Sequence, residues 1–145
     1  MKSVCVVLLL YLILYTQQSS SHGVEYSVGD HAYLNLLVSV SPDIPATDSG
    51  AVLENIKDWL TLGSRDLYKA TKGWAFIQTV KILVPAEWED VTGDVSTAFH
   101  ETHEDAEIRV EYDHSVYKNS PFTLQTGGCG EPGEYTQVSS DFFIS

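Results

Sequence analysis

The stretch from Ser49 to Thr71 constrains the fold more than any other part of this 145-residue chain. Its apolar residues recur at helical spacing and share one stripe, while most of the charged residues lie outside that stripe. The stripe comprises Val52, Leu53, Ile56, Trp59, Leu60, Gly63 and Leu67. Asp48 or Ser49 can cap the start, and Lys69 and Gly73 are typical of a helix C-terminus. The pattern predicts one long amphipathic helix.

Strand patterns flank this helix on both sides. Residues 32–40 alternate with period two before a proline-containing break, and residues 74–84 form an aromatic and β-branched run that Pro85 closes. The second run is apolar on both faces, which is typical of a central strand with cover on both sides. Because the chain offers only one strong helix, we expect sequence outside this chain to cover the other face. A strand, a crossover helix and a second strand form a βαβ unit, so the sheet is expected to be partly parallel.

The C-terminal half carries weaker patterns. Residues 85–105 are polar and acidic and predict a loop or a short helix, and residues 106–112 alternate strictly and predict a third strand. The glycine- and proline-containing segment 122–140 predicts an irregular region with at most short edge strands. The chain ends on an apolar cluster, residues 142–144, which usually leads into another packed element, so we expect the chain to be a fragment or short product of a longer protein. Together these patterns predict a single α/β domain with a mixed, partly parallel sheet and a long crossover helix.

The N-terminal 21 residues predict a secretory signal peptide. Lys2 precedes an unbroken apolar and aromatic run from Val4 to Tyr15, and a polar stretch of small residues ends at Ser21. The alternative is a membrane anchor, which would need roughly 17 to 25 apolar residues. We therefore expect cleavage of residues 1–21, a mature domain of residues 22–145 without a transmembrane helix, and a secreted, extracellular protein.

Cleavage would remove Cys5 and leave Cys129 as the single cysteine of a secreted chain. Thiols normally pair in oxidising compartments. Cys129 is therefore expected to be a buried free thiol, half of an intermolecular bridge, or the partner of a cysteine encoded outside this chain.

The charge balance excludes one class of partner. Eight Lys and Arg residues stand against 20 Asp and Glu residues, a formal net charge of −12. Since this field repels phosphate backbones, no nucleic acid partner is expected.

The segment from His100 to Asp105 comes closest to a metal motif. A zincin helix needs His-Glu-x-x-His, because a spacing of four places two imidazoles on one helical face beside a glutamate base. Here the second histidine, His103, comes one residue early, and Glu104 stands where the motif needs histidine. The remaining histidines show no ligand spacing: His22, His31 and His114.

Other catalytic chemistry is equally absent from the sequence pattern. Cys129 lacks a neighbouring cation that would stabilise a thiolate nucleophile. Clusters of carboxylates could be imagined as a general acid and base but match solvated surface charge: Glu87, Glu89 and Asp90, and Glu104, Asp105 and Glu107. No catalytic, cofactor-binding or metal-binding residue is predicted, and the chain is expected not to be an enzyme.

Several short motifs follow the leader in a specific order, from about residue 31 to residue 143. They are Tyr33 through Val40 before Pro42 and Pro45; Ile56-Lys57-Asp58 leading to Leu67-Tyr68-Lys69-Ala70-Thr71; Val80 through Pro85 with Ala86-Glu87-Trp88; Asp105-Ala106; and Pro121 through Gln125 before Cys129-Gly130-Glu131-Pro132-Gly133-Glu134. In this order they resemble the N-terminal domain of the calcium-activated chloride channel regulators. Residues 135–142 depart from the family pattern, which usually shows a more apolar strand ending in Thr-Pro-x-Phe.

The resemblance implies the first half of a zincin-like metalloprotease domain, whose sheet and crossover helix precede the zinc-binding helix. Zinc is the cofactor of the full-length family domain, but its ligands lie beyond Ser145, so no catalytic residue and no cofactor are carried over to this chain. It also implies a parent protein that modulates a separate chloride channel. The partner of Cys129 would then lie in C-terminal sequence that this chain lacks.

Two functions are expected on these grounds. The first is a secreted, metalloprotease-like but non-catalytic N-terminal segment of a chloride channel regulator, with the C-terminal part of the same protein, another protein or a chloride channel as partner. The second is a stand-alone secreted acidic binding module or decoy that acts through protein contacts.

Overall fold

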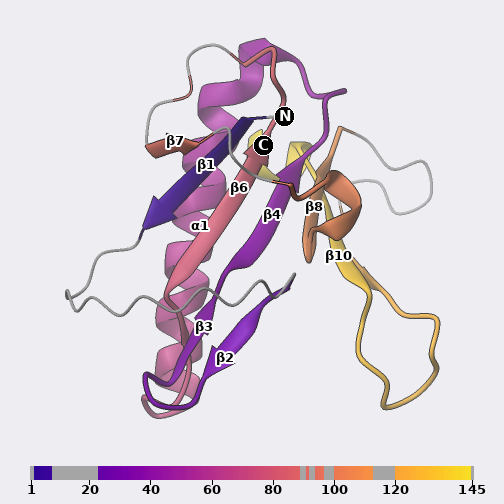
Figure 1. Ribbon diagram of the computed structural model, residues 1–145. Coiled ribbons are helices and arrows are strands. Elements are labelled where there is room, and N and C mark those ends of the chain that lie inside the picture. The colour runs from indigo at the N-terminus through magenta and orange to yellow at the C-terminus, as the bar shows by residue number, and fades with distance from the viewer. Residues whose placement is uncertain are drawn as a thin grey trace.

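The computed structural model describes residues 2–7, 23–88, 91, 94–96, 100–112 and 120–144. Within them a larger and a smaller β-sheet pack beside one long helix (Figure 1). The strands are β1 (Lys2–Val7), β2 (Glu25–Ser27), β3 (Ala32–Leu34), β4 (Leu36–Val40), β5 (Phe76–Ile77), β6 (Thr79–Val84), β7 (Asp94–Ser96), β8 (Ile108–Glu111), β9 (Phe122–Leu124) and β10 (Tyr135–Ser139). The helices are α1 (Ser49–Ala70), α2 (Asp141–Ile144) and the short 3₁₀ turns η1 (Ala46–Asp48) and η2 (His103–Asp105).

The larger sheet has the order β7-β1-β6-β4-β8-β10-β9. Its inner strands β6, β4, β8 and β10 run parallel, whereas β1 and β9 are antiparallel to their inner neighbours. The long helix α1 connects β4 to the small sheet and so to β6. The predicted α/β class, with a mixed, partly parallel sheet and a long crossover helix, is confirmed.

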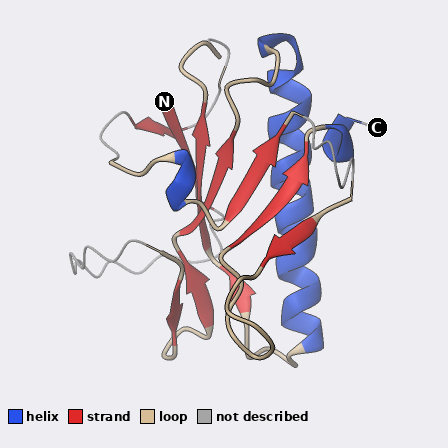
Figure 2. Cartoon of the chain, turned by 90° about the vertical axis from the view of Figure 1, so that its right-hand side faces the viewer, coloured by secondary structure: helices blue, strands red, loops and turns tan. Residues whose placement is uncertain are grey.

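The predicted helix is also confirmed. Asp48 occupies the N-cap position of α1, without a side-chain hydrogen bond. At the other end Gly73 has a φ of 89°, and its N–H donates to the Tyr68 carbonyl at 2.8 Å, as in a Schellman-type cap. Figure 2 shows α1 along one face of the sheet, where the core forms. The core joins Val52, Leu53, Ile56 and Leu60 of α1 to Val38, Val40, Val80, Ile82, Val84, Val110 and Val138 of the strands.

The two strands predicted beside the helix are each broken in two, so their predicted continuity is wrong. Asn35, with a φ of 60°, separates β3 from β4, and Gln78 separates β5 from β6. The first halves join β2 in the small sheet, of order β2-β3-β5. Both breaks lie side by side, because Asn35 N–H donates to Thr79 Oγ1 at 2.8 Å and Gln78 N–H donates to the Tyr33 carbonyl at 2.9 Å.

The C-terminal region is more regular than predicted. Strand β8 confirms the third predicted strand, but β10 lies between β8 and β9 instead of at an edge. The alternation of β10 is hidden in its sequence because Gln137, Ser139 and Ser140 are buried beside Val138. The apolar C-terminus is itself packed, since Phe143 of α2 is buried and contacts the Trp59 ring of α1 at a centroid distance of 5.8 Å. A further packed element after residues 142–144 remains a prediction.

The expectation that sequence outside the chain covers the second face is wrong for the region of Leu83. Leu83, Leu37 and Ala106 form a small buried cluster there, and η2 lies on the side of the sheet opposite α1 (Figure 2). Elsewhere on this face, Ser39, Lys81 and Glu111 have hydrogen-bond partners within the chain.

Strand β1 falls within the predicted signal peptide. It pairs with β6 and with β7. The cleavage of residues 1–21 remains a prediction, and residues 8–22 lie outside the described part of the chain.

Candidate functional site

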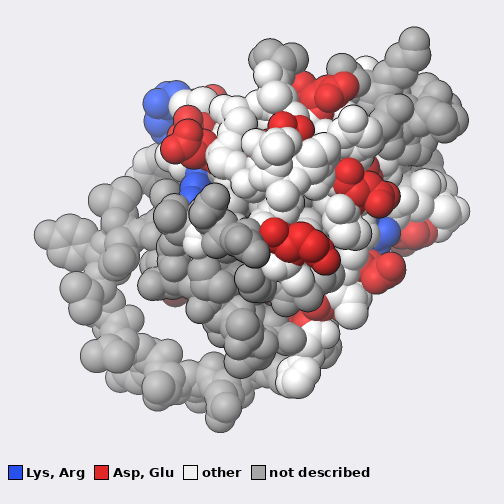
Figure 3. All heavy atoms as spheres, turned by 90° about the horizontal axis from the view of Figure 1, so that it is seen from above, with Lys and Arg blue, Asp and Glu red and all other residues white. Residues whose placement is uncertain are grey.

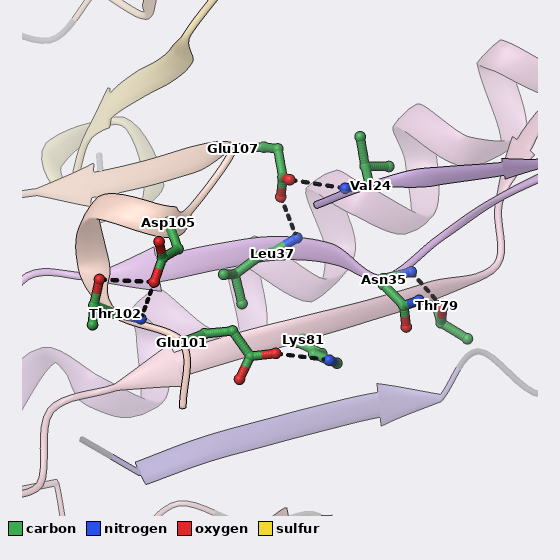
Figure 4. A network of polar contacts seen from close by, with 9 residues as sticks. All are labelled: Val24, Asn35, Leu37, Thr79, Lys81, Glu101, Thr102, Asp105 and Glu107. Carbon is green, nitrogen blue, oxygen red and sulfur yellow. Dashed lines mark hydrogen bonds and ion pairs between the residues drawn. The ribbon is translucent and has the colours of Figure 1, made fainter. Parts of the chain in front are cut away.

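A polar network covers the face of the sheet opposite α1. Its centre is the segment 101–105, here named the polar strap, which includes η2. Asp105 Oδ2 accepts hydrogen bonds from the Thr102 N–H at 2.7 Å and from the Thr102 hydroxyl at 2.9 Å (Figure 4). These two bonds close the turn locally, as a side chain does at a helix N-terminus. The turn thereby points His103 at the sheet.

His103 joins two strands of the sheet. Its Nε2 lies 2.7 Å from Glu111 Oε1 on β8, and its Nδ1 lies 2.9 Å from Ser39 Oγ on β4. Because an ionised carboxylate can only accept, Nε2 carries a hydrogen and donates it to Glu111 Oε1, while Nδ1 is hydrogen-bonded to the Ser39 hydroxyl. Serine, histidine and a carboxylate are also the residue types of a nucleophilic triad. Ser39 is 0% exposed, so no substrate reaches its hydroxyl in this arrangement, and the three residues act as a structural link.

The electrostatics of Glu111 follow from this link. The hydrogen bond from His103 lowers the pKa of the Glu111 carboxyl below its usual range. Burial acts in the opposite direction, and contributions from Ser41 and the Arg109 charge add to the lowering. The carboxylate is therefore ionised and held in place by three elements of the chain.

A second polar anchor ties the polar strap to β6. Lys81 Nζ lies 2.9 Å from Glu101 Oε1, and both side chains are at least three-quarters buried (Figure 4). Burial acts to raise the pKa of Glu101, but the hydrogen bond and charge of Lys81, with backbone hydrogen bonds, bring it below the usual value. The polar strap thus contacts β6, β4 and β8 in turn.

Arg109 adds a third anchor, on β8. Its Nη2 donates to the Glu104 carbonyl at 2.6 Å, and its guanidinium carbon lies 3.8 Å from the centroid of the Tyr135 ring. Arg109 Nε is buried and has no hydrogen-bond partner among the described residues. The Arg109 side chain therefore contacts both the polar strap and β10.

Glu107 ties the N-terminal segment to the sheet. Its two carboxylate oxygens accept from the Val24 N–H at 2.9 Å and from the Leu37 N–H at 2.8 Å (Figure 4). A residue predicted as solvated surface charge thus has a structural role.

The small sheet and the end of α1 present an aromatic surface, here named the aromatic end. It comprises Tyr26, His31, Tyr33, Tyr68, Trp74 and Phe76. Trp74 is 64% exposed, although its ring contacts His31 at a centroid distance of 4.4 Å and its carbonyl accepts the Tyr26 hydroxyl at 2.6 Å. Exposed aromatic side chains that are fixed in place are typical of protein-contact surfaces.

An open groove of about 540 Å³ adjoins the aromatic end, between α1 and β5. Tyr68, Phe76 and Ile77 give it apolar walls, and Arg65 stands at its rim. Ser64 also lines the groove and joins α1 to β5, because its hydroxyl accepts from the Ile77 N–H at 2.9 Å and donates to the Ile77 carbonyl at 3.0 Å. The groove belongs to the size class of ligand and peptide sites.

The residues singled out from the sequence are dispersed. His100 is exposed, His31 belongs to the aromatic end, and Cys129 is a free, exposed cysteine, which excludes the buried thiol and leaves the other two accounts open. His22, His114, Glu89 and Asp90 lie outside the described residues. Within the described ranges no three His, Cys, Asp or Glu side chains are placed to hold a metal ion.

Sequence reasoning missed the link between Ser39, His103 and Glu111. A signal was available, because Ser39 interrupts an otherwise apolar strand and Glu111 lies on the polar side of another. Neither Ser39 nor Glu111 indicates in the sequence that it contacts His103, since these contacts require β4 and β8 to be neighbours in the sheet.

Two surface properties complete the description. Viewed from above, acidic side chains dominate the visible charged surface (Figure 3), in keeping with the net charge of −12. In the described part of the chain no helix has both the length and the apolar character needed to cross a bilayer.

Comparison with known proteins matches this sequence to a family. Residues 27–145 match the family model described as calcium-activated chloride channel N terminal. The chain is 31% identical over 123 residues to calcium-activated chloride channel regulator 2 of Homo sapiens and 32% identical over the same length to that of Mus musculus, which is 85% of this chain and 13% of each relative. It is 28% identical over 138 residues to calcium-activated chloride channel regulator 4 of Homo sapiens, 95% of this chain and 14% of that relative.

No solved structure matches the chain. The zincin-like fold therefore rests on the resemblance alone. The chain spans about one-seventh of the length of these curated relatives. With most of its residues matched by the family model, the chain belongs to the family of the calcium-activated chloride channel regulators and corresponds to their N-terminal domain.

Proposed function

We propose that this chain is a secreted, non-catalytic contact domain of a chloride channel regulator and that it influences chloride conductance by binding another protein. The match of residues 27–145 to the family's N-terminal domain carries this proposal. The partner would be a chloride channel, the C-terminal part of a longer protein of the same family, or a protein that connects the two.

The use of the reactive side chains supports a non-catalytic role. Both ring nitrogens of His103 have partners within the sheet, and the Ser39 hydroxyl beside it is buried. A general base must reach the proton that it removes from a substrate. The ring nitrogens of His103 are hydrogen-bonded to Glu111 and Ser39, so neither is free to take a proton from a substrate. The nearby Glu101 is paired with Lys81.

The aromatic end and its groove support a role in protein contacts. Tyr68, 51% exposed, lines the 540 Å³ groove, and Trp74, 64% exposed, belongs to the aromatic end. Tryptophan, tyrosine and arginine are the residue types that most often contribute the binding energy of protein interfaces. Arg65 at the rim supplies the third type.

A current measurement tests the proposal. Purified protein is applied to epithelial cells, and the calcium-activated chloride current is recorded in the whole-cell configuration. We expect the wild-type protein to change the current, Trp74→Ala to abolish the change, and Tyr112→Ala to retain it. Tyr112 is 50% exposed but follows the C-terminal end of β8, which lies beside the end of β4 remote from the small sheet. An unchanged current with wild-type protein would contradict the proposed function.

Secretion and the absence of a resident metal are tested separately. Intact mass of the protein in the medium is expected to correspond to residues 22–145 or a start within a few residues of them. The secreted protein is expected to hold substoichiometric zinc and to show no chelator-sensitive peptide cleavage, since catalytic zinc needs three protein ligands and an open position. One tightly held zinc ion per chain would overturn the non-catalytic assignment.

A stand-alone module or decoy is the second candidate, and one observation favours it. The chain supplies cover for both faces of its sheet, with α1 on one side and the polar strap on the other. This cover within the chain supports folding of the domain on its own. A secreted species with the mass of residues 22–145 alone would support this candidate, whereas only a much larger species would refute it.

A further inference from the structure

The position of β1 shows what fits beside β6. Six residues, Lys2 to Val7, pair antiparallel with Thr79–Val84 in unbroken register, from Lys2 opposite Val84 to Val7 opposite Thr79. In the order of the sheet β1 stands between β6 and β7 (Figure 1), and among the described strands β7 pairs with β1 alone. An extended segment is therefore seated along the whole outer edge of β6.

Removal of the leader would empty this place. This step rests on the secretion included in the proposed function, because β1 lies inside the predicted signal peptide. Strand β6 would then become the edge of a sheet of order β6-β4-β8-β10-β9. Its backbone N–H and C=O groups on that side would lose their partners.

The edge that results is poorly protected against pairing. Natural edge strands carry charges, prolines or bulges that discourage the addition of another strand. The only charged residue of β6 is Lys81, whose ammonium group lies 2.9 Å from Glu101 of the polar strap, and the strand contains no proline. Its other residues are those of a central strand, with Val80, Ile82, Leu83 and Val84 buried.

We propose that the mature chain binds an extended peptide segment of a partner protein along β6, antiparallel, in the place that β1 occupies. Directly opposed residues of neighbouring strands share a face of the sheet. The peptide residues opposite Val80 and Ile82 would then lie on the side of α1 and should be apolar and β-branched, as Val6 and Val4 are. The residue opposite Lys81 would lie on the side of the polar strap and should be small or polar, as Cys5 is small.

A peptide titration tests this proposal. The probe is a fluorescent peptide with the sequence of Lys2–Val7 and the change Cys5→Ser, which prevents a disulfide with Cys129. It is titrated into protein recovered from the medium, after intact mass has shown that the leader is absent. We expect saturable binding by anisotropy and slower hydrogen exchange of the Thr79–Val84 amides in the complex.

Two matched peptides make the test specific. Alternate residues of a strand direct their backbone groups to opposite neighbours. One peptide is N-methylated at the positions of Val4 and Val6, and the other at the positions of Ser3 and Cys5. The two peptides therefore lose backbone N–H donors on opposite edges of the strand. The peptide whose methylated donors face β6 should bind at least about tenfold more weakly than the parent, since each lost hydrogen bond costs about 1 kcal/mol. The other peptide loses donors that face β7, which also pairs with this place, so it is expected to bind more weakly than the parent as well.

The outcomes are separable from those of the proposed function. Retention of residues 1–21 in the secreted protein would contradict secretion with cleavage and leave the β6 edge closed, which would overturn both. With the leader absent, failure of the parent peptide to bind, or binding of both methylated peptides as tight as that of the parent, would overturn only the β6 proposal. The chloride current measurement is unaffected by either peptide result, because it depends on the aromatic end.

Discussion

Replacement of His103 by alanine is expected to destabilise the fold by about 2–4 kcal/mol near neutral pH. The substitution removes the 2.7 Å hydrogen bond to the Glu111 carboxylate and the 2.9 Å contact with the Ser39 hydroxyl. A hydrogen bond to a charged group contributes about 1.5–3 kcal/mol, and a buried hydroxyl left without a partner costs about 1–3 kcal/mol. The polar strap keeps its other anchors, so the two contributions add only in part.

The effect of His103→Ala on the free energy of unfolding should depend on pH. The folded-state pKa of Glu111 lies below the ordinary value of 4.5, so its stabilising contribution is complete above that value and is lost as the pH falls through the folded pKa. In the His103→Ala protein the largest cause of that lowering is absent. The difference in free energy of unfolding between the two proteins should therefore shrink as the pH is lowered below about 4.5.

Urea unfolding, followed by fluorescence at several pH values, measures both effects. His100→Ala is the matched control, because His100 is exposed and three residues away; its effect should stay within about 0.5 kcal/mol. A double-mutant cycle with Glu111→Gln should give a coupling energy of about 1 kcal/mol or more. The reasoning fails if His103→Ala changes the unfolding free energy by less than about 0.5 kcal/mol, or if its effect does not vary with pH.

Three further predictions follow from other parts of the fold. Ser64→Ala removes the hydroxyl that bonds both backbone groups of Ile77 and should lower the free energy of unfolding by about 1–2 kcal/mol in urea titration; no loss would refute this role. Gly73→Ala, at a φ of 89°, should lower the thermal midpoint, whereas Gly63→Ala inside α1 meets no atom within 4 Å and should raise it. Cys129→Ser should abolish disulfide-linked dimers on non-reducing gels, and their persistence would exclude this exposed cysteine as their source.

The sequence predicted the helix and the parallel inner strands because these depend on local periodicity. The stripe of α1 and the apolar runs on either side are signals within single segments. The breaks at Asn35 and Gln78 were not predicted, since neither is a glycine or a proline. Asn35 tolerates a φ of 60° better than most residues. This tolerance makes a break possible there, but an asparagine in a strand pattern does not by itself predict one.

The polar side of the sheet lay beyond sequence reasoning for a different reason. The contacts of His103 with Ser39 and Glu111 span 64 and 8 residues, and they arise only once β4 and β8 are neighbours. In the sequence His103 stood out for its nearness to a zinc motif. Its observed role depends on tertiary structure, as does that of Glu107, which bonds backbone groups 83 and 70 residues away.

The paired breaks at Asn35 and Gln78 couple the lengths of two distant parts of the chain. The chain crosses between the small and the large sheet twice, and the crossings are joined by the bonds from Asn35 to Thr79 and from Gln78 to Tyr33. A one-residue insertion in only one crossing would shift β3 against β5, or β4 against β6, and turn every side chain of the shifted strand to the other face. Insertions or deletions should therefore be tolerated here only in matched pairs, one in each crossing, and a change in length near residue 35 should require a compensating change near residue 78.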